Sequence, residues 1–277
     1  MFWKKGVLFC DLNPTCYAIS RQKGIWQRHI RDFVRPAAWA KEKRTDKLPN
    51  LVSSHSSTMI KRGPGIDPVL QENKAVNIDL ACRRINGTVI RPGQVFSFWR
   101  TVGKTSARKG YREGRVIEQK RLVAGTGGGL CNLGNTIHWL VLHSPLDVVE
   151  FHSHSDALAP DGPKRIPFSS GTSVCYNYID YRFQNNTDQD VQLLVWCEDG
   201  KLNGEIRSLR EYPWQYQLVE EDHHFQKEGE KFYRNSRIYQ QKLDRVDGRV
   251  LEQKLVLKNH SEVMYDYDLI PADQIRE

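Results

Sequence analysis

The stretch VNIDLACRRINGTVIRPGQVFSFW, residues 76–99, decides the fold of this chain. Its first half continues an apolar pattern at helical spacing that starts near Pro68 and includes Val76, Leu80 and Ile85, and the Asn-Gly pair at 86–87 stops the helix. β-forming residues then flank a Pro-Gly turn at 91–93. The stretch therefore predicts a helix over 68–85 and a hairpin or strand pair over 88–98.

The rest of the chain predicts one more helix and several strands around this stretch. We expect a strand at 115–118, a helix over 131–142, a strand over 147–154, a Pro-rich loop over 157–171, a hairpin joining 174–183 to 191–196, and a strand over 201–206. These elements indicate an α+β protein with helices packed against a mainly antiparallel sheet. We expect an N-terminal extension over 1–66 that is partly helical, a central domain over 67–206, and a C-terminal extension over 207–277 with short strands.

Charge and composition limit the classes of partner. The chain has 277 residues, 41 Lys and Arg against 33 Asp and Glu, and a net charge of +8, so its surface favours an anionic polymer, anionic lipid or nucleic acid. The sequence contains no helix-turn-helix, finger or ribonucleoprotein motif, and we therefore expect no specific nucleic-acid binding. A hydrophobic content of 39% is enough to form a folded core.

The N-terminus and the cysteines bear on the compartment. The apolar run after Lys5 is interrupted by Asp11 and Pro14, whereas a signal peptide needs about 7–15 apolar residues. No window approaches the roughly 18 apolar residues of a membrane span. The six cysteines include no CxxC pair, which fits neither a disulfide scaffold nor a zinc knuckle. We expect no transmembrane segment and a cytoplasmic location, with membrane or wall association left open.

Cys131 is the residue on which chemistry would centre. It follows Gly127, Gly128 and Gly129, and it opens the expected helix over 131–142. The helix dipole and free amides at such a position lower a thiol pKa, and the same amides can hold an oxyanion. The glycines allow close approach of a substrate. The alternatives are a plain flexible turn and a small buried thiol. A phosphate-binding loop is disfavoured because Lys and a hydroxyl residue are missing after the glycines.

Histidines provide the candidate bases. His138 lies about 10 Å along the same helix, and His143 lies at the helix end, so both are interpreted as structural. His152 and His154 alternate on the expected strand and project to one side together with Glu150 and Asp156. One histidine could serve as the base, with a slight preference for His152. Glu150, Asp156 or Asn132 could orient its ring.

The spacing of His152 and His154 also leaves a metal site open. Two histidines two residues apart on a strand can bind zinc, with Cys131 or Asp156 as a third ligand. A solvated polar strand face explains the same pair. No strong ligand motif accompanies it, so the preferred hypothesis contains no metal and no other cofactor.

Several motifs in a fixed order resemble the VanW family. They are NIxLA at 77–81, INGxVIxPGxxFSF at 85–98, GY at 110–111, GGGLC at 127–131, NT at 135–136 and HxHS at 152–155. The resemblance extends over about residues 67–206 and identifies this part as a VanW-like domain. It implies a role as an accessory factor of glycopeptide (vancomycin) resistance. Some members are regarded as peptidoglycan L,D-transpeptidases with a cysteine nucleophile, which would make Cys131 the acylated residue and a peptidoglycan stem peptide or precursor the partner.

Two departures from the family pattern lie near this site. Asn132 stands where the family usually has Gln, and Gly171 stands where it has Asp. Asn132 keeps an amide, but Gly171 removes a carboxylate that could orient a base. Three hypotheses follow: a cysteine-dependent acyltransferase, a non-catalytic binder of a wall precursor, and a metal-assisted hydrolase that uses His152 and His154.

Overall fold

The protein is an α+β molecule with helices on one side of an antiparallel sheet. The computed structural model describes residues 8–60, 67–118, 121–153, 156–157, 160 and 171–276. The α-helices are α1 (Pro14–Val34), α2 (Pro68–Ile85), α3 (Phe98–Val102) and α4 (Leu130–Leu142), and four short 3₁₀ turns are η1 (Phe9–Asp11), η2 (Ala107–Lys109), η3 (Tyr267–Leu269) and η4 (Ala272–Gln274). Within these described ranges, no helix has the length and apolar character needed to cross a bilayer.

Helix α2 confirms the helix predicted over 68–85. Asp67 caps its N-terminus by accepting a hydrogen bond from the Val69 amide at 2.8 Å, and Pro68 occupies the first turn, where its missing N–H costs nothing. Ile78 and Ile85 are fully buried on its inner face. At its end, the Asn86 side chain accepts a hydrogen bond from the Val195 amide at 3.1 Å, which attaches the helix stop to the sheet.

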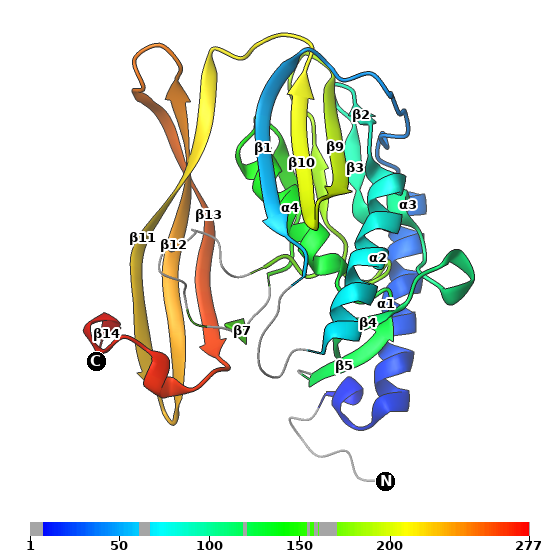
Figure 1. The fold of residues 1–277 in the computed structure, drawn as a ribbon, viewed down its shortest axis with the longest axis vertical. Helices are drawn as coiled ribbons and strands as arrows, with labels where there is room; N and C mark the ends of the chain where they lie inside the picture. Colours follow the sequence, from blue (N-terminus) through cyan, green and yellow to red (C-terminus); the bar gives the residue numbers. More distant parts are fainter. Residues whose placement is uncertain are drawn as a thin grey trace.

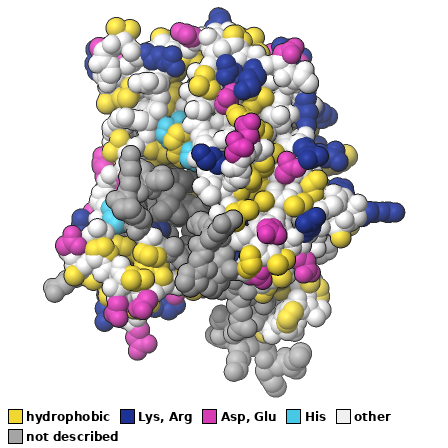
Figure 2. All heavy atoms as spheres, in the orientation of Figure 1, with side chains coloured by type: hydrophobic (Ala, Val, Ile, Leu, Met, Phe, Trp, Pro, Cys, Tyr) yellow, Lys and Arg dark blue, Asp and Glu magenta, His cyan; other side chains and the backbone are white. Residues whose placement is uncertain are grey.

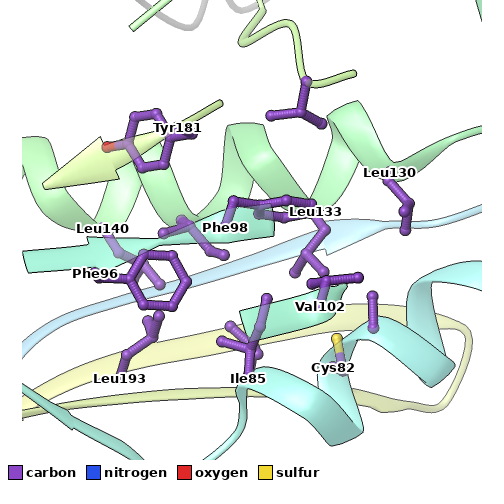
Figure 3. Close-up of a cluster of buried hydrophobic side chains, with 14 of the residues drawn as sticks. Cys82, Ile85, Phe96, Phe98, Val102, Leu130, Leu133, Leu140, Tyr181 and Leu193 are labelled. Atoms are coloured by element: carbon purple, nitrogen blue, oxygen red, sulfur yellow. The ribbon is translucent and has the colours of Figure 1, made fainter. Parts of the chain in front are cut away.

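The central sheet has the order β1-β10-β9-β2 and is antiparallel throughout. Its strands are β1 (Asn50–Thr58), β10 (Lys201–Ser208), β9 (Val191–Glu198) and β2 (Thr88–Ile90). Helix α2 packs on β9, and α4 packs on β10 and β1, so the core lies between the helices and the sheet. Figure 3 shows Phe96, Leu140 and Leu193 converging there. Each such side chain stabilises the fold by about 1.5–3 kcal/mol.

The expected hairpins over 88–98 and 174–196 are wrong. β3 (Val95–Ser97) does not pair with β2 but with β8 (Arg182–Gln184), which also pairs with β6 (Asp147–Glu150). β8 and β9 therefore belong to different sheets. The buried side chain of Asn185 donates to the carbonyls of Ile90 and Gln189, and the backbone carbonyl of Asn185 accepts from the Gly93 amide. Asn185 therefore holds both the β2–β3 connection and the β8–β9 connection, each of which passes from one sheet to the other.

A separate hairpin leads into α4. β4 (Glu113–Glu118) pairs with β5 (Arg121–Thr126), which confirms the expected strand at 115–118. β5 is followed by the turn over 127–129 and then by α4, which begins one residue earlier than the predicted helix. The hairpin lies beside α2 in Figure 1.

The N-terminal residues contribute to the main body of the protein. β1 pairs along its whole length with β10, and the Ser53 hydroxyl donates to the Leu140 carbonyl of α4 at 2.9 Å. The central sheet thus includes a strand from the segment 1–66, which we expected to be an extension. β1 has the sequence NLVSSHSST, in which apolar and polar residues do not alternate clearly, so the sequence pattern did not indicate this strand.

The C-terminal residues form a second sheet beside the first, with the order β14-β11-β12-β13-β7 (Figure 1). Its strands are β11 (Trp214–Glu228), β12 (Lys231–Asp244), β13 (Val250–Val263), β7 (Asp156–Ala157) and β14 (Ile275–Arg276). The first three have 15, 14 and 14 residues and are longer than the expected short strands. They are polar on both faces, so apolar alternation detects only fragments of them. Gln240 donates to the Leu142 carbonyl at 2.7 Å and ties this sheet to α4.

Candidate functional site

The turn before α4 is packed closely by backbone and side chains of other segments. A Cβ on Gly128 would lie 2.2 Å from the Gly114 carbonyl carbon, and one on Gly129, where φ is +94°, would lie 2.1 Å from Cγ of Lys74. The amides of Gly127 and Gly128 donate to the carbonyls of Arg112 and Gly125. These contacts explain why the turn needs glycine.

Asn77 of α2 holds this turn in place, and its role was not predicted from the sequence. Its side-chain amide donates to the carbonyls of Gly128 at 2.9 Å and Arg112 at 3.0 Å, and its oxygen accepts from the Arg112 amide at 2.8 Å. The residue is fully buried. Three bonds from one buried side chain fix the turn against the start of β4, and the only signal in the sequence was its place in the NIxLA motif.

Cys131 is the second residue of α4 and is half-buried. Its Sγ lies 3.8 Å from the Val174 carbonyl oxygen. Burial raises the pKa of the thiol, the backbone of Val174 and of Cys131 itself lowers it in part, and the neighbouring Cys175 adds to the increase. The expected net lowering of the thiol pKa is therefore wrong, because desolvation outweighs the backbone hydrogen bonds to the sulfur. The thiol is protonated at neutral pH.

The segment over 171–175 covers the first turns of α4. Asn135 accepts a hydrogen bond from the Thr172 amide, and a Cβ on Gly171 would lie 2.6 Å from the Asn135 side-chain nitrogen. Thr172 is fully buried, and its hydroxyl has no hydrogen-bond partner. Asn132, predicted at the site, is half-buried in the same first turn, and its amide donates to the Gly129 carbonyl at 3.1 Å. Gly171 thus permits a close backbone approach to α4.

His152 lies on the other side of this segment. Its carbonyl accepts from the Ser173 amide at 2.7 Å, and its Nε2 lies 3.0 Å from Oε1 of Glu150. The ring is 44% exposed. In the described part of the chain, no hydrogen bond joins the ring to the thiol of Cys131. The two residues are connected through the backbone of 173–174 rather than by direct contact.

The expected single strand over 147–154, with four polar side chains on one face, is wrong. β6 ends at Glu150, with a register shift after Val148, and Asp156 belongs to β7 in the other sheet, paired with Glu262. At the end of β6 the Glu150 side chain enters a largely buried charge network. His154 and the side chain of Asp156 lie outside the described residues.

Glu150 is the centre of that charge network. Both of its oxygens accept from the guanidinium of Arg28 in α1, and Nε of Arg182 lies 3.5 Å from Oε2. Burial alone would raise the pKa of Glu150, but the hydrogen bonds from His152 and Arg28 and the charge of Arg182 lower it to about 2. Glu150 is therefore a carboxylate at neutral pH, and it can orient the His152 ring.

Two further carboxylates complete the network. Asp32 of α1 pairs with Arg182 at 2.8 Å, and the fully buried Asp180 accepts from Nε of Arg182 at 2.6 Å and from the hydroxyl of Ser97 at 2.6 Å. Asp180 and Arg182 are two residues apart, whereas Asp32 lies 150 residues from Arg182 and Ser97 lies 83 residues from Asp180. No local pattern could have revealed these two long-range contacts.

The other histidines of this region are structural, as interpreted from the sequence. His138 is buried, its Nδ1 lies 2.9 Å from the Tyr181 hydroxyl, and burial lowers its pKa to about 3. His143 caps α4 through a 2.8 Å contact with the Trp139 carbonyl, and burial lowers its pKa to about 4. Across the ranges that the structure describes, no group of three or more His, Cys, Asp or Glu side chains could hold a metal ion. His154, which the metal hypothesis also needs, lies outside the described residues.

A cleft of about 470 Å³ lies apart from Cys131, between the central body and the C-terminal sheet. Its lining includes Asp147, Arg210, Tyr212, Trp214 and Tyr216. Burial and the charges of Glu252 and Asp147 raise the pKa of Tyr216 to about 12. The cleft thus combines aromatic rings with charged groups of both signs.

Comparison with known proteins places these features in a family context. Residues 73–207 match the family model described as VanW like protein. Over 218 residues the chain is 26% identical to the Vancomycin B-type resistance protein VanW of Enterococcus faecalis, and the alignment covers 79% of each protein. It is 29% identical over 120 residues to the uncharacterized protein YoaR of Bacillus subtilis, which covers 43% of this chain and 38% of that protein. No solved structure gives a significant match.

Proposed function

Because residues 73–207 form a VanW-like domain, we propose that this chain is an accessory protein of glycopeptide resistance whose Cys131 transfers the acyl group of a peptidoglycan stem peptide. The similarity to the enterococcal vancomycin resistance protein supports the biological context. The observation that carries the chemistry is the placement of Cys131 in the first turn of α4, directly after a turn fixed by Asn77.

The start of α4 supplies the electrostatic part of the reaction. The first amides of a helix have no partner in the helix, and they carry its positive dipole end. In α4 the Asn132 amide donates to the Gly129 carbonyl, whereas within the described residues the Leu130 amide makes no backbone hydrogen bond at the start of the helix, and the Cys131 amide faces its own sulfur. When a thiolate attacks an amide carbonyl, the oxygen becomes negative, and such amides stabilise it.

The proposed reaction has two steps. Cys131 loses its proton to a base, its sulfur forms a bond to the stem-peptide carbonyl carbon, and the C–N bond breaks as the amine leaves with a proton. An amine of a second stem then attacks the thioester, the C–S bond breaks, and the thiolate of Cys131 is regenerated. The base must be supplied because burial keeps the thiol protonated.

His152 is the proposed base. It is exposed enough to exchange protons with solvent, and the carboxylate of Glu150 holds its Nε2 at 3.0 Å. Transfer from Cys131 to His152 requires a movement of the segment over 172–174 or one bridging water, because the thiol and ring do not touch. His154 would act in its place if it lies closer to the bound substrate.

Intact-mass measurement with purified stem peptides tests the proposal. We expect a thioester adduct on the wild-type protein that disappears in Cys131→Ala and persists in the matched control Cys175→Ala, because Cys175 is a half-buried thiol of the same region. His152→Ala should slow adduct formation without abolishing the folded state. Absence of both adduct and cross-linked product in the wild type would refute acyl transfer.

Binding of a wall precursor without turnover is the second candidate. The cleft with Tyr212, Trp214 and Tyr216 favours it, since aromatic faces and nearby charged groups suit sugar rings and stem peptides. In this case calorimetric titration with a muropeptide should detect binding that Trp214→Ala weakens and Cys131→Ala leaves unchanged. Binding that depends on Cys131 and not on Trp214 would exclude the cleft.

A further inference from the structure

The outward face of α1 carries large apolar side chains in a continuous stripe. Ile19, Trp26, Ile30 and Phe33 are all exposed, with 61% of Trp26 and 87% of Phe33 accessible to solvent. At about 100° per residue these positions fall within roughly 60° of the helix circumference. Further exposed apolar side chains at the two ends of the helix are Leu8, Phe9, Leu12 and Val34.

The opposite face of α1 is held firmly by the protein. Arg28 donates to both oxygens of Glu150, and Asp32 pairs with Arg182 at 2.8 Å. Gly24 packs so closely that a Cβ there would lie 2.2 Å from the Tyr178 ring. Because these contacts fix the rotation of α1, the apolar stripe points away from the described body of the protein.

The exposed charged side chains of α1 and its C-cap have one sign. Lys23 borders the stripe, Arg31 lies further round the helix, and Arg35 is the C-cap; all three are exposed. Asp32 is the only acidic residue in α1, and its side chain is 8% exposed within its ion pair with Arg182. Figure 2 shows further Lys and Arg side chains along the right-hand edge, on the side of α1, α2 and the β4–β5 hairpin.

We infer that α1 lies flat on the surface of an anionic lipid bilayer, with its apolar stripe in the headgroup boundary. A helix with an exposed stripe of Trp, Phe and Ile, whose exposed charged side chains are all basic, has the composition of interfacial helices. A second copy of the chain fits less well, because two such faces would bring like charges together. The helix does not have the apolar character to span a bilayer.

Membrane docking would place the candidate site near the bilayer. The inner face of α1 holds Glu150, and Glu150 holds His152, so the charge network lies about one helix diameter, roughly 10–12 Å, from the lipid-facing stripe. This consequence rests on the proposed function and suits a wall precursor that is carried by a lipid. The docking itself does not depend on Cys131.

Vesicle co-sedimentation of the full chain tests the inference. We expect binding to vesicles of phosphatidylglycerol and phosphatidylcholine, weak binding to phosphatidylcholine alone, and loss of binding at high salt. The double variant Trp26→Ser/Phe33→Ser should bind at least about tenfold more weakly. Lys23→Gln should bind about fivefold more weakly, since a base near an anionic surface contributes a factor of about five.

The matched control removes two exposed apolar side chains, one from the turn between β12 and β13 and one from β13. Val246→Ser/Leu255→Ser alters two exposed residues far from α1 in the sequence and should bind vesicles like the wild type. Cys131→Ala should also bind normally, so failure of acyl transfer and failure of docking give separate results. Unchanged binding in the α1 variants, or equal binding to both vesicle types, would overturn the inference. The inference would also be overturned if the wild type did not bind vesicles but formed a dimer, and if Trp26→Ser/Phe33→Ser abolished that dimer.

Discussion

The buried ion pair between Arg28 and Glu150 makes a quantitative prediction about stability. The pKa of Glu150 is about 2 in the folded protein, whereas an unperturbed Glu has a pKa of about 4.3. The difference corresponds to about 3 kcal/mol of stabilisation of the carboxylate at neutral pH. His152, Arg28 and Arg182 share this effect. Removing Arg28, which contacts both oxygens, should therefore cost about 2 kcal/mol.

Urea unfolding of Arg28→Ala, followed by circular dichroism and tryptophan fluorescence at pH 7 and pH 3, measures this cost. Because the folded pKa of Glu150 is lowered, its stabilisation is fully present above about pH 5 and is lost as the pH falls toward 2. The destabilisation by Arg28→Ala should thus be about half as large at pH 3 as at pH 7.

Arg31→Ala is the matched control, because Arg31 lies on the same helix and is exposed. It should change the unfolding free energy by less than about 0.5 kcal/mol. A cost below about 0.5 kcal/mol for Arg28→Ala, or a cost that is the same at both pH values, would refute the argument that the charge of Glu150 holds α1 in place.

Three other predictions follow from the site. Burial raises the pKa of Cys131, so iodoacetamide should alkylate this thiol slowly at pH 7. The alkylation rate should continue to rise at pH values above the usual cysteine pKa of about 8.5. Rapid labelling at pH 7 would contradict the effect of burial. Burial lowers the pKa of His138 to about 3, so the folded protein keeps this ring neutral while the unfolded chain binds a proton below about pH 6.5. The urea midpoint of the wild type should therefore fall as the pH decreases from about 6.5 toward 3. His138→Gln should be less stable at pH 7, but its urea midpoint should depend less on pH over this range. Gly128→Ala should lower the melting temperature strongly, because the added Cβ would lie 2.2 Å from the backbone of Gly114. Gly134→Ala in α4, where the nearest atom would lie 3.4 Å from the added Cβ, should change the unfolding free energy by less than about 1 kcal/mol. Equal effects of the two substitutions would show that the turn can relax.

The elements that were predicted correctly are those specified by nearby residues. The helix over 68–85 has its cap, its apolar face and its stop within one continuous segment, and α4 likewise follows directly from the glycine turn. The strand over 201–206 follows an Asp199-Gly200 turn and pairs with its neighbour β9. The spacing of apolar residues and the residue types in a turn are local properties, so they can be identified directly in the sequence.

The site was only partly accessible in this way. The position of Cys131 in the first turn of α4 and the proximity of Glu150 to His152 could be inferred from local spacing. The direction of the thiol pKa could not, because it depends on how completely Val174 and its neighbours cover the sulfur. Asn77, Arg28 and Asp180 were missed because each acts through a contact with a segment distant in the chain.

The sequence alone determined the VanW-like motifs, the α+β class, the two main helices and the presence of a cysteine at the start of α4. Only the tertiary structure decided that β2 and β3 enter different sheets, that β1 joins the central sheet, and that Glu150 turns inward to Arg28. The physical reason is that strand partners and buried ion pairs are chosen by the competition among all segments for hydrogen bonds and burial. That competition takes place between residues that the chain keeps far apart until it folds.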